Sequence, residues 1–426
     1  MTAGGGAGRR NERPDMVAFI VRAAMRLLAR WLSRRAAART TADHLPLPVA
    51  VRDARAILVV ALAEIGDMVL LTVFLRELRR LSSSAHVTLV CLPGVRNLFE
   101  CSSDVDEVIV YDAAMPRLLR PIQLPRRARA FARHHLAGRF DVAIVPRWDT
   151  DQHLASAVTV FSGTPRRVGH TEQSNARKRT LNAGFDALFT DVVTSLGVAH
   201  EVERHLDMLR ALGAEAPSPE LRLQLSAEDR RRAADALSMW GGAGPLVAFG
   251  IGAAHPKRRW PVARFVEVGR EMQRAYGAHV IVVGGPADLL AQAELLRDLG
   301  PAATGLAGLL SLRETAAVLE RCRLFIGNDS APMQLAAAAG VASVEISCHP
   351  TGGDPRHNNA PERFAPWGVP SVVLRPAAPV APCTLCCAAV RPHCILAITP
   401  TSVLAAAAAL LGRGTVVESS PAARGV

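Results

Sequence analysis

The sequence predicts an α/β protein of two domains, each a parallel sheet with helices on both faces. Its 426 residues exceed what one ordinary hydrophobic core supports, so two domains are expected. Short apolar runs alternate with amphipathic segments along most of the chain, which is typical of strands alternating with helices. Small and polar residues follow several of these runs, where an open parallel sheet binds its ligands.

The clearest strand–loop–helix–strand unit covers residues 323–346. An apolar run at 324–326 is broken by turn residues at 327–330, and Pro332 suits the first turn of the helix that follows. Gly340 is a natural end for this Ala-rich helix, and a second apolar strand follows at 341–346. The unit therefore predicts two buried parallel strands joined by a helix.

The other elements are predicted in the same way, with strands at short apolar runs and helices where apolar residues recur with a helical period. In the first domain, 51–215, the predicted strands are 56–62, 86–92, 107–111 and 141–146, and the helices are 68–80, 95–100, 126–136 and 201–212. A connector at 213–219 leads to the second domain, 220–412, with further strands at 246–250 and 278–283 and helices at 227–240, 262–276, 287–299, 312–322 and 402–411. Residues 413–426 form a tail.

Residues 1–50 form a basic arm. They hold nine arginines against three acidic residues, half of the chain's net charge of +12. Residues 16–38 have a helical, amphipathic pattern that could contact an anionic membrane surface, pack on the protein itself or resemble a targeting leader. No apolar run reaches the roughly 18–20 residues of a membrane-spanning helix, and arginines interrupt the only leader-like stretch. The expected location is cytoplasmic, with peripheral contact to the inner face of the membrane as an option.

The eight cysteines are too few for a disulfide scaffold in a chain of this length and fit a reducing compartment. Four of them cluster near one histidine in the sequence: Cys383, Cys386, Cys387 and Cys394, beside His393. Their spacing departs from common zinc patterns, so buried free thiols are expected and a metal is the alternative.

Gly66 and Asp67 follow the first predicted strand. Asp67 has two interpretations. It can cap the next helix, or it can accept a proton from a substrate hydroxyl as a general base.

The loop at 250–261 joins small residues to cations. Gly252 and Ala253 allow a ligand to approach the backbone, and Lys257 and Arg258 suit a diphosphate. A basic surface loop is the alternative.

Two further loops carry polar residues at strand ends. Asp288 follows two glycines and can accept hydrogen bonds from a ribose, or cap a helix. Asp329 and Ser330 precede the helix that contains Pro332, whose first N–H groups favour a phosphate. A simple helix cap is again the alternative.

Residues 164–182 are polar and turn-rich, with five cations: Arg166, Arg167, Arg177, Lys178 and Arg179. They form either a solvated surface or a basic rim that faces an anionic acceptor.

Several function classes are disfavoured by the sequence. It contains no P-loop, no His-Glu-x-x-His motif and no Ser-His-Asp order, and the first turn lacks the dinucleotide fingerprint. Aromatic residues make up only 4% of the chain, which leaves few stacking platforms for a nucleic acid.

The chain resembles family 9 glycosyltransferases, the heptosyltransferases of lipopolysaccharide assembly. The resemblance spans roughly residues 55–400 and rests on motifs in the family's order: 57–80 with Gly66-Asp67 and Phe74-Leu75-Arg76-Glu77-Leu78, the loop 257–261, Gly284-Gly285-Pro286, Gly308 with Ser311-Leu312, and 327–334. The basic arm lies outside it.

The resemblance implies a GT-B fold, in which two Rossmann-like, doubly wound domains face each other across a cleft. It also implies a metal-independent inverting transferase without a cofactor. Such an enzyme moves a sugar, ADP-heptose being the donor in characterised members, from the C-terminal donor domain to a lipid-linked saccharide on the N-terminal acceptor domain. By motif position, Asp67 matches the proposed base and Lys257 or Arg258 the diphosphate cation. Asp288 matches the ribose ligand, and Asp329, Ser330 and Ala331 match the loop at the diphosphate and sugar.

Two residues depart from the family pattern, which has Gly at Ala331 and His at Gln334. Ala331 adds a methyl group where backbone approaches the donor, and Gln334 cannot become positively charged. The alternative is therefore a degenerate, non-catalytic module of the same fold that binds a nucleotide-sugar or glycolipid.

Overall fold

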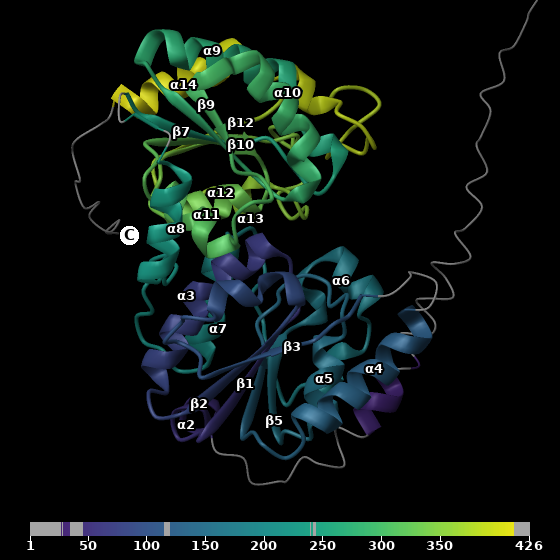
Figure 1. Ribbon diagram of the computed structural model, residues 1–426. Helices are drawn as coiled ribbons and strands as arrows, with labels where there is room; N and C mark the ends of the chain where they lie inside the picture. The colour runs from purple at the N-terminus through teal and green to yellow at the C-terminus, as the bar shows by residue number, and fades with distance from the viewer. Residues whose placement is uncertain are drawn as a thin grey trace, which may run out of the picture.

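The protein, described here from a computed structural model, contains two six-stranded sheets in two domains stacked on one another (Figure 1). The structure describes residues 27, 29–34, 46–114, 120–238, 240–241 and 244–412. All strand pairs in both sheets are parallel. The predicted fold, two Rossmann-like domains across a cleft, is confirmed.

The first sheet has the strand order β3-β2-β1-β4-β5-β6. Its strands are β1 (Ala56–Ala61), β2 (His86–Cys91), β3 (Glu107–Val110), β4 (Val142–Val145), β5 (Arg166–His170) and β6 (Asp191–Val193). The longer helices are α2 (Leu47–Arg52), α3 (Ile65–Leu81), α4 (Arg120–His135), α5 (Ala155–Ser162), α6 (Ala176–Leu181) and α7 (Glu201–Ala211), with a 3-10 helix η1 at Pro93–Phe99. Central strands such as β1 are apolar throughout because helices cover both faces of the sheet.

The second sheet repeats this topology in the order β12-β11-β10-β7-β8-β9. Its strands are β7 (Leu246–Gly250), β8 (His279–Val283), β9 (Ala303–Gly305), β10 (Leu324–Asn328), β11 (Ser343–Ile346) and β12 (Ser371–Leu374). The helices are α8 (Ala227–Ala236), α9 (Val262–Tyr276), α10 (Leu289–Leu299), α11 (Leu312–Leu319), α12 (Ala331–Ala338), α13 (Pro361–Phe364) and α14 (Pro400–Gly412), with η5 at Pro256–Arg258 and η6 at Pro286–Asp288.

Each sheet reverses its strand order at one point. In the first sheet this switch lies between β1 and β4, and in the second between β7 and β10. Loops leave adjacent strands in opposite directions there and open a crevice at the carboxyl ends of the strands. Each domain is therefore expected to bind its ligand at its switch point.

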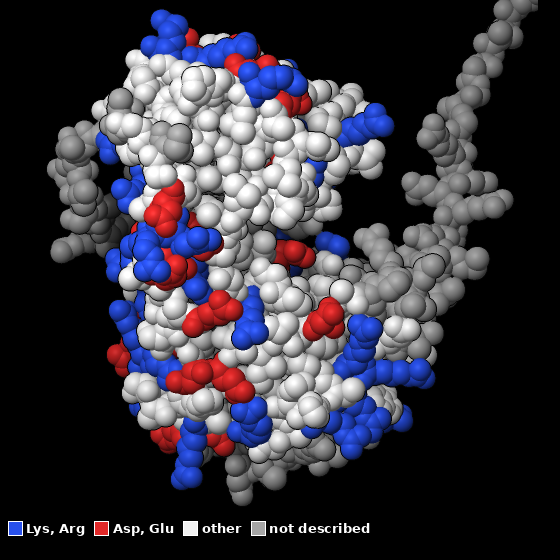
Figure 2. All heavy atoms as spheres, viewed as in Figure 1, with Lys and Arg blue, Asp and Glu red and all other residues white. Residues whose placement is uncertain are grey.

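The domains are joined along one side by a continuous hydrophobic core. This core includes Phe74 of α3, Leu209 of α7, Ala316 of α11 and Met333 of α12. Arg313 reinforces the joint by donating to the carbonyl oxygen of Asn97 in η1 at 2.6 Å. In Figure 1, helices α3, α8, α11 and α12 mark this side, and Figure 2 shows a hollow between the domains at the opposite edge.

Two sequence expectations about the first domain were wrong. Helix α3 begins at Ile65, not at Met68, because Glu64 is its extended N-cap residue. Asp67 therefore lies inside the first turn and is not the cap. The turn-rich segment around 164–182 also contains a buried strand, β5. The arginines of this segment suggested an exposed surface. Arg166 can nevertheless be buried in the strand because its Nε pairs at 2.6 Å with Oδ2 of Asp191 on the neighbouring strand β6.

The described part of the basic arm packs on its own domain. Residues 29–34 are helical, and Ala29 and Leu32 are buried in the core beside α5. The ring of Trp31 lies 5.9 Å from that of Phe161. For this stretch the structure supports packing on the protein surface. The rest of the predicted 16–38 segment and the tail at 413–426 lie outside the described residues.

Among the described residues, no helix has the length and apolarity needed to span a membrane.

Candidate active site

The switch point of the first sheet holds a carboxylate and a guanidinium. Asp67 follows β1 in the first turn of α3, and Arg147 follows β4. The Nη1 of Arg147 donates to Oδ2 of Asp67 at 3.1 Å, and both side chains are 22% exposed. Among the described residues, no other group bonds this carboxylate. Asp67 is therefore held in a fixed direction while one of its oxygens stays available to a ligand.

Arg147 lies between two carboxylates. Burial lowers the pKa of Arg147, but the charges of Asp67 and Asp149 outweigh burial and hold it above its usual value. Its Nε donates to the carbonyl oxygen of Thr150 at 3.0 Å, which ties it to the loop after β4. Arg147 is thus a permanent cation beside Asp67.

A buried ion network crosses from the first domain to the second. Arg363 of α13 donates from Nη1 to Asp149 at 2.9 Å and from Nε to Glu201 at 2.7 Å. Burial raises the pKa of Asp149, but the charges of Arg363 and Arg147 reverse this and lower it. Burial also raises the pKa of Glu201, which the nearby Arg363 only partly offsets. Arg363 therefore links the two domains next to Asp67.

The switch point of the second sheet holds a matching pair of charges. Arg258 lies in the loop after β7, and Asp329 follows β10. The distance from Nη1 of Arg258 to Oδ2 of Asp329 is 3.3 Å. Burial raises the pKa of Asp329, while Arg258 opposes the shift and Asp67 adds to it. Asn328 fixes the two loops together, since its amide donates to Ile251 at 2.7 Å and accepts from the backbone of Trp260 at 3.0 Å.

The start of α12 is free of side-chain caps. Ser330 is the N-cap residue, but its hydroxyl donates to the carbonyl oxygen of Asn328 instead of accepting from the helix. Ala331 is the first helical residue. An eight-residue helix with an uncapped N-terminus can accept an anion there.

Gln334 faces back toward the domain joint. Its Nε2 donates to the carbonyl oxygen of Phe364 at 2.6 Å, and its buried Oε1 has no hydrogen-bond partner among the described residues. A Cβ placed on Gly66 would lie 3.4 Å from its Cγ, so the first turns of α3 and α12 touch here. The two switch points therefore face each other.

The remaining predicted donor residues gather on the second domain. Asp288 accepts from the backbone of Gly285 at 3.0 Å, as a turn cap, and its carboxylate lies over Gly252. A Cβ at Gly252 would collide with that carboxylate, so any other residue there would have to displace the side chain of Asp288. Ala253 is buried, and its carbonyl oxygen accepts from Arg259 at 2.9 Å. Lys257 points elsewhere, because its Nζ donates to the carbonyl oxygen of Cys387 at 2.5 Å.

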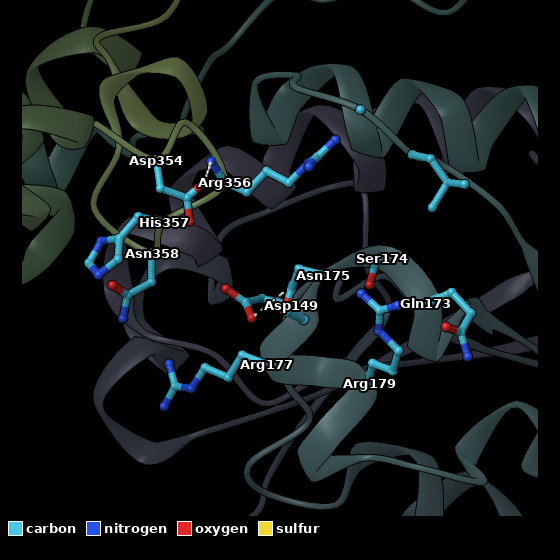
Figure 3. A pocket seen from close by; sticks show the side chains of 13 residues that line it. Asp149, Gln173, Ser174, Asn175, Arg177, Arg179, Asp354, Arg356, His357 and Asn358 are labelled. Carbon is cyan, nitrogen blue, oxygen red and sulfur yellow. Dashed lines mark hydrogen bonds between the residues drawn. The ribbon is translucent and has the colours of Figure 1, made fainter. Parts of the chain in front are cut away.

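A cavity of about 670 Å³ opens between the domains next to Asp149 (Figure 3). The first domain lines it with Asn175, the N-cap residue of α6, and with Arg177 and Arg179 of α6 itself, and the second with the loop that carries Arg356 and His357. On the face drawn in Figure 2, basic side chains gather at the lower right, on the first domain, and are mixed with acidic ones on the left, so the described residues form no continuous basic track across it.

The prediction that Lys178 belongs to the acceptor-binding surface was wrong. It is buried, and its Nζ donates to the carbonyl oxygens of Trp148 and His170 at 3.1 and 3.0 Å. Burial lowers the pKa of Lys178 to about 8, although Asp151 opposes the shift. Sequence position alone could not separate it from its exposed neighbours Arg177 and Arg179.

We expect Lys178→Met to destabilise the protein by about 2–3 kcal/mol, because it leaves buried carbonyl oxygens without a donor. Urea unfolding measures this change. Arg177→Met and Arg179→Met are the matched controls, and surface changes of this kind stay within about 0.5 kcal/mol. An unchanged stability in Lys178→Met would refute the structural role.

Sequence reasoning missed Arg147, Asp149 and Arg363. Arg147 and Asp149 carry a usable signal, since they directly follow a predicted strand, as Asp67 does. No sequence pattern marks Arg363 as a site residue, because it reaches the site only through the packing of α13 on the first domain.

The cysteine cluster lies on the second domain, between β12 and α14. Cys383, Cys387 and Cys394 gather around His393, and Cys386 is outside the cluster. The expectation that no metal binds stays a prediction at this point.

Comparisons with known proteins place this geometry in context. The sequence profile of glycosyltransferase family 9 (heptosyltransferase) matches residues 128–347. A family 9 glycosyltransferase structure from Veillonella parvula shares 24% identity at a TM-score of 0.68, covering 88% of this chain and all of that one. ADP-heptose lipopolysaccharide heptosyltransferase II of Escherichia coli shares 21% identity at a TM-score of 0.61, over 84% of this chain and 99% of its own.

A third structure, Escherichia coli heptosyltransferase WaaC with ADP, shares 17% identity at a TM-score of 0.57, over 76% of this chain and 93% of its own. These structures support the fold. Among curated protein sequences, none matched this chain significantly.

Proposed function

Because the chain belongs to glycosyltransferase family 9, the heptosyltransferase family, we propose that it is an inverting glycosyltransferase that moves heptose from ADP-heptose to a lipopolysaccharide-type acceptor. The observation that carries this proposal is the pairing of the two switch points. One presents a carboxylate held by Arg147, and the other presents a cation and an uncapped helix N-terminus. These are the groups that sugar transfer from a nucleotide diphosphate requires.

The second domain provides the donor site in this proposal. Arg258 and the first turn of α12 neutralise the charge that develops on the leaving diphosphate, and Asp288 accepts hydrogen bonds from the ribose. Fixed groups of this kind stabilise a transition state strongly because they need no reorganisation. Since the chain itself supplies the cations, we expect transfer without a catalytic metal ion.

The first domain provides the base and the acceptor site. Asp67 takes the proton of an acceptor hydroxyl, which attacks the anomeric carbon on the face opposite the nucleotide. Arg147 orients the carboxylate through one oxygen and leaves the other for the hydroxyl. The cavity with Arg177 and Arg179 suits an anionic, lipid-linked saccharide. Contact of residues 16–38 with the inner membrane face remains a prediction.

The deciding experiment offers the purified protein ADP-heptose, UDP-sugars and GDP-sugars together with a lipopolysaccharide-core acceptor. We expect transfer from ADP-heptose alone, without added divalent cation and after brief EDTA treatment, with inverted configuration in the product. Transfer from a UDP-sugar instead would overturn the donor assignment. Donor binding without turnover would favour the non-catalytic module, to which Ala331 and the inward-facing Gln334 point.

Arg258→Ala tests the donor site directly. We expect ADP to bind about 10–100-fold more weakly, the effect of losing charge-assisted contacts to a phosphate. Isothermal titration calorimetry measures the affinity, and Arg270→Ala on the exposed face of α9 is the control. Equal ADP affinities in the two variants would remove Arg258 from the site.

A further inference from the structure

A compact cluster of sulfur and nitrogen atoms lies outside the proposed active site. The sulfurs of Cys383, Cys387 and Cys394 and a ring nitrogen of His393 all lie within 4.8 Å of one another. All three cysteines are buried, and none of the eight cysteines forms a disulfide. Four residues of one segment, 383–394, thus bring their ligand atoms close together.

The distances in this cluster suit a tetrahedral metal site. The Nδ1 of His393 lies 3.6 Å from the sulfur of Cys383 and 3.5 Å from that of Cys394. A zinc ion with bonds of about 2.3 Å to sulfur and about 2.0–2.1 Å to nitrogen sets these ligand atoms about 3.5–3.6 Å apart at tetrahedral angles. The two nitrogen–sulfur distances therefore match those of a tetrahedral site, and all four ligand atoms lie within 4.8 Å of one another.

The surroundings provide a second feature of thiolate sites. The backbone N–H of Ala388 donates to the sulfur of Cys383 at 3.4 Å. Metal-bound thiolates commonly accept such outer hydrogen bonds, which fix the ligand and spread its charge. The imidazole nitrogen that lies near two sulfurs is the arrangement that a shared metal ion produces.

We propose that Cys383, Cys387, His393 and Cys394 bind one structural metal ion, with Zn²⁺ as the ion that fits best. Three thiolates and one imidazole complete a tetrahedral shell, so the protein leaves no open position for a substrate. The ion is therefore structural and takes no part in sugar transfer.

The metal site braces the loops around the cleft. The carbonyl oxygen of Cys387 accepts from Lys257 at 2.5 Å, in the loop after β7. The carbonyl oxygen of Leu385 accepts from the backbone of Asp354 at 2.8 Å, at the start of the loop that lines the cavity. Fixing Cys383 and Cys387 on a metal fixes the backbone between them, and with it both neighbouring loops.

Elemental analysis of the purified full-length protein tests the proposal without measuring activity. We expect about one equivalent of zinc per chain, as a closed structural site retains its metal through purification. In the same protein reconstituted with Co²⁺ under reducing conditions, we expect thiolate-to-cobalt charge-transfer bands and intense visible bands typical of tetrahedral coordination. A wild-type protein that gives neither zinc nor these cobalt bands would overturn the proposal.

The sequence offers a matched pair of variants. Cys387→Ser removes a ligand, whereas Cys386→Ser changes the adjacent cysteine, which is outside the cluster. We expect at least a tenfold loss of bound metal in Cys387→Ser and none in Cys386→Ser. Equal metal loss in the two variants would overturn the ligand assignment. If Cys387→Ser does not fold, the cobalt spectrum of the wild-type protein still decides.

Discussion

Replacement of Asp67 by Asn is expected to lower the rate of sugar transfer by a factor of about 10²–10⁴, the contribution typical of a general base. Asn keeps the size of the side chain and an oxygen that can accept from Arg147, but it cannot take up the acceptor proton. ADP affinity should change little, because the proposed donor contacts belong to the second domain. Single-turnover rates and calorimetric ADP binding measure the two effects separately.

The control for this prediction is Asp235→Asn, which removes an exposed carboxylate on α8. Transfer by Asp67→Asn at a rate close to that of Asp235→Asn would show that another group takes the proton. A matching loss of ADP binding in Asp67→Asn would instead indicate a disturbed cleft.

Replacement of Arg363 by Met is expected to destabilise the protein by about 3–5 kcal/mol, the usual effect of removing one member of a buried ion network. Arg363 is 1% exposed and bonds both Asp149 and Glu201, which the variant would leave without their shared cation. Urea unfolding at neutral pH measures the loss, and small-angle scattering reports whether the domains separate.

Two further variants separate charge from packing in this network. Arg356→Met changes an exposed arginine in the same region and should shift stability by less than about 0.5 kcal/mol. Adding Glu201→Gln to Arg363→Met should recover part of the loss, because one unpaired buried carboxylate is removed. A double variant less stable than Arg363→Met alone would contradict an electrostatic origin.

The sequence predicts the position of most site residues on the fold, because those residues directly follow strands. Asp67 follows β1, Arg258 follows β7 and Asp329 follows β10, and each strand is visible as a short apolar run with turn residues behind it. In each of the two parallel sheets the carboxyl ends of the strands meet at one edge, so local pattern and general topology together indicate a site on each domain.

The same reasoning failed where a charged residue is buried. Strand β5 begins with Arg166 and Arg167, and Lys178 shares a basic run with Arg177 and Arg179. Their burial depends on a carboxylate or carbonyl oxygens supplied by other elements, such as Asp191 for Arg166. Polarity patterns record the charge of a residue but not the partner that permits its burial.

The sequence by itself therefore determined the family resemblance, the two α/β domains and the loops that carry Asp67, Arg258 and Asp329. Only the tertiary structure decided which residues meet: Arg147 with Asp67, Arg363 with Asp149, and Cys387 instead of Cys386 with His393. The physical reason is that strand order brings Arg147 to Asp67, domain packing brings Arg363 to Asp149, and the fold of one loop brings Cys387 to His393, each over a few ångströms. Spacing along the chain does not encode such distances.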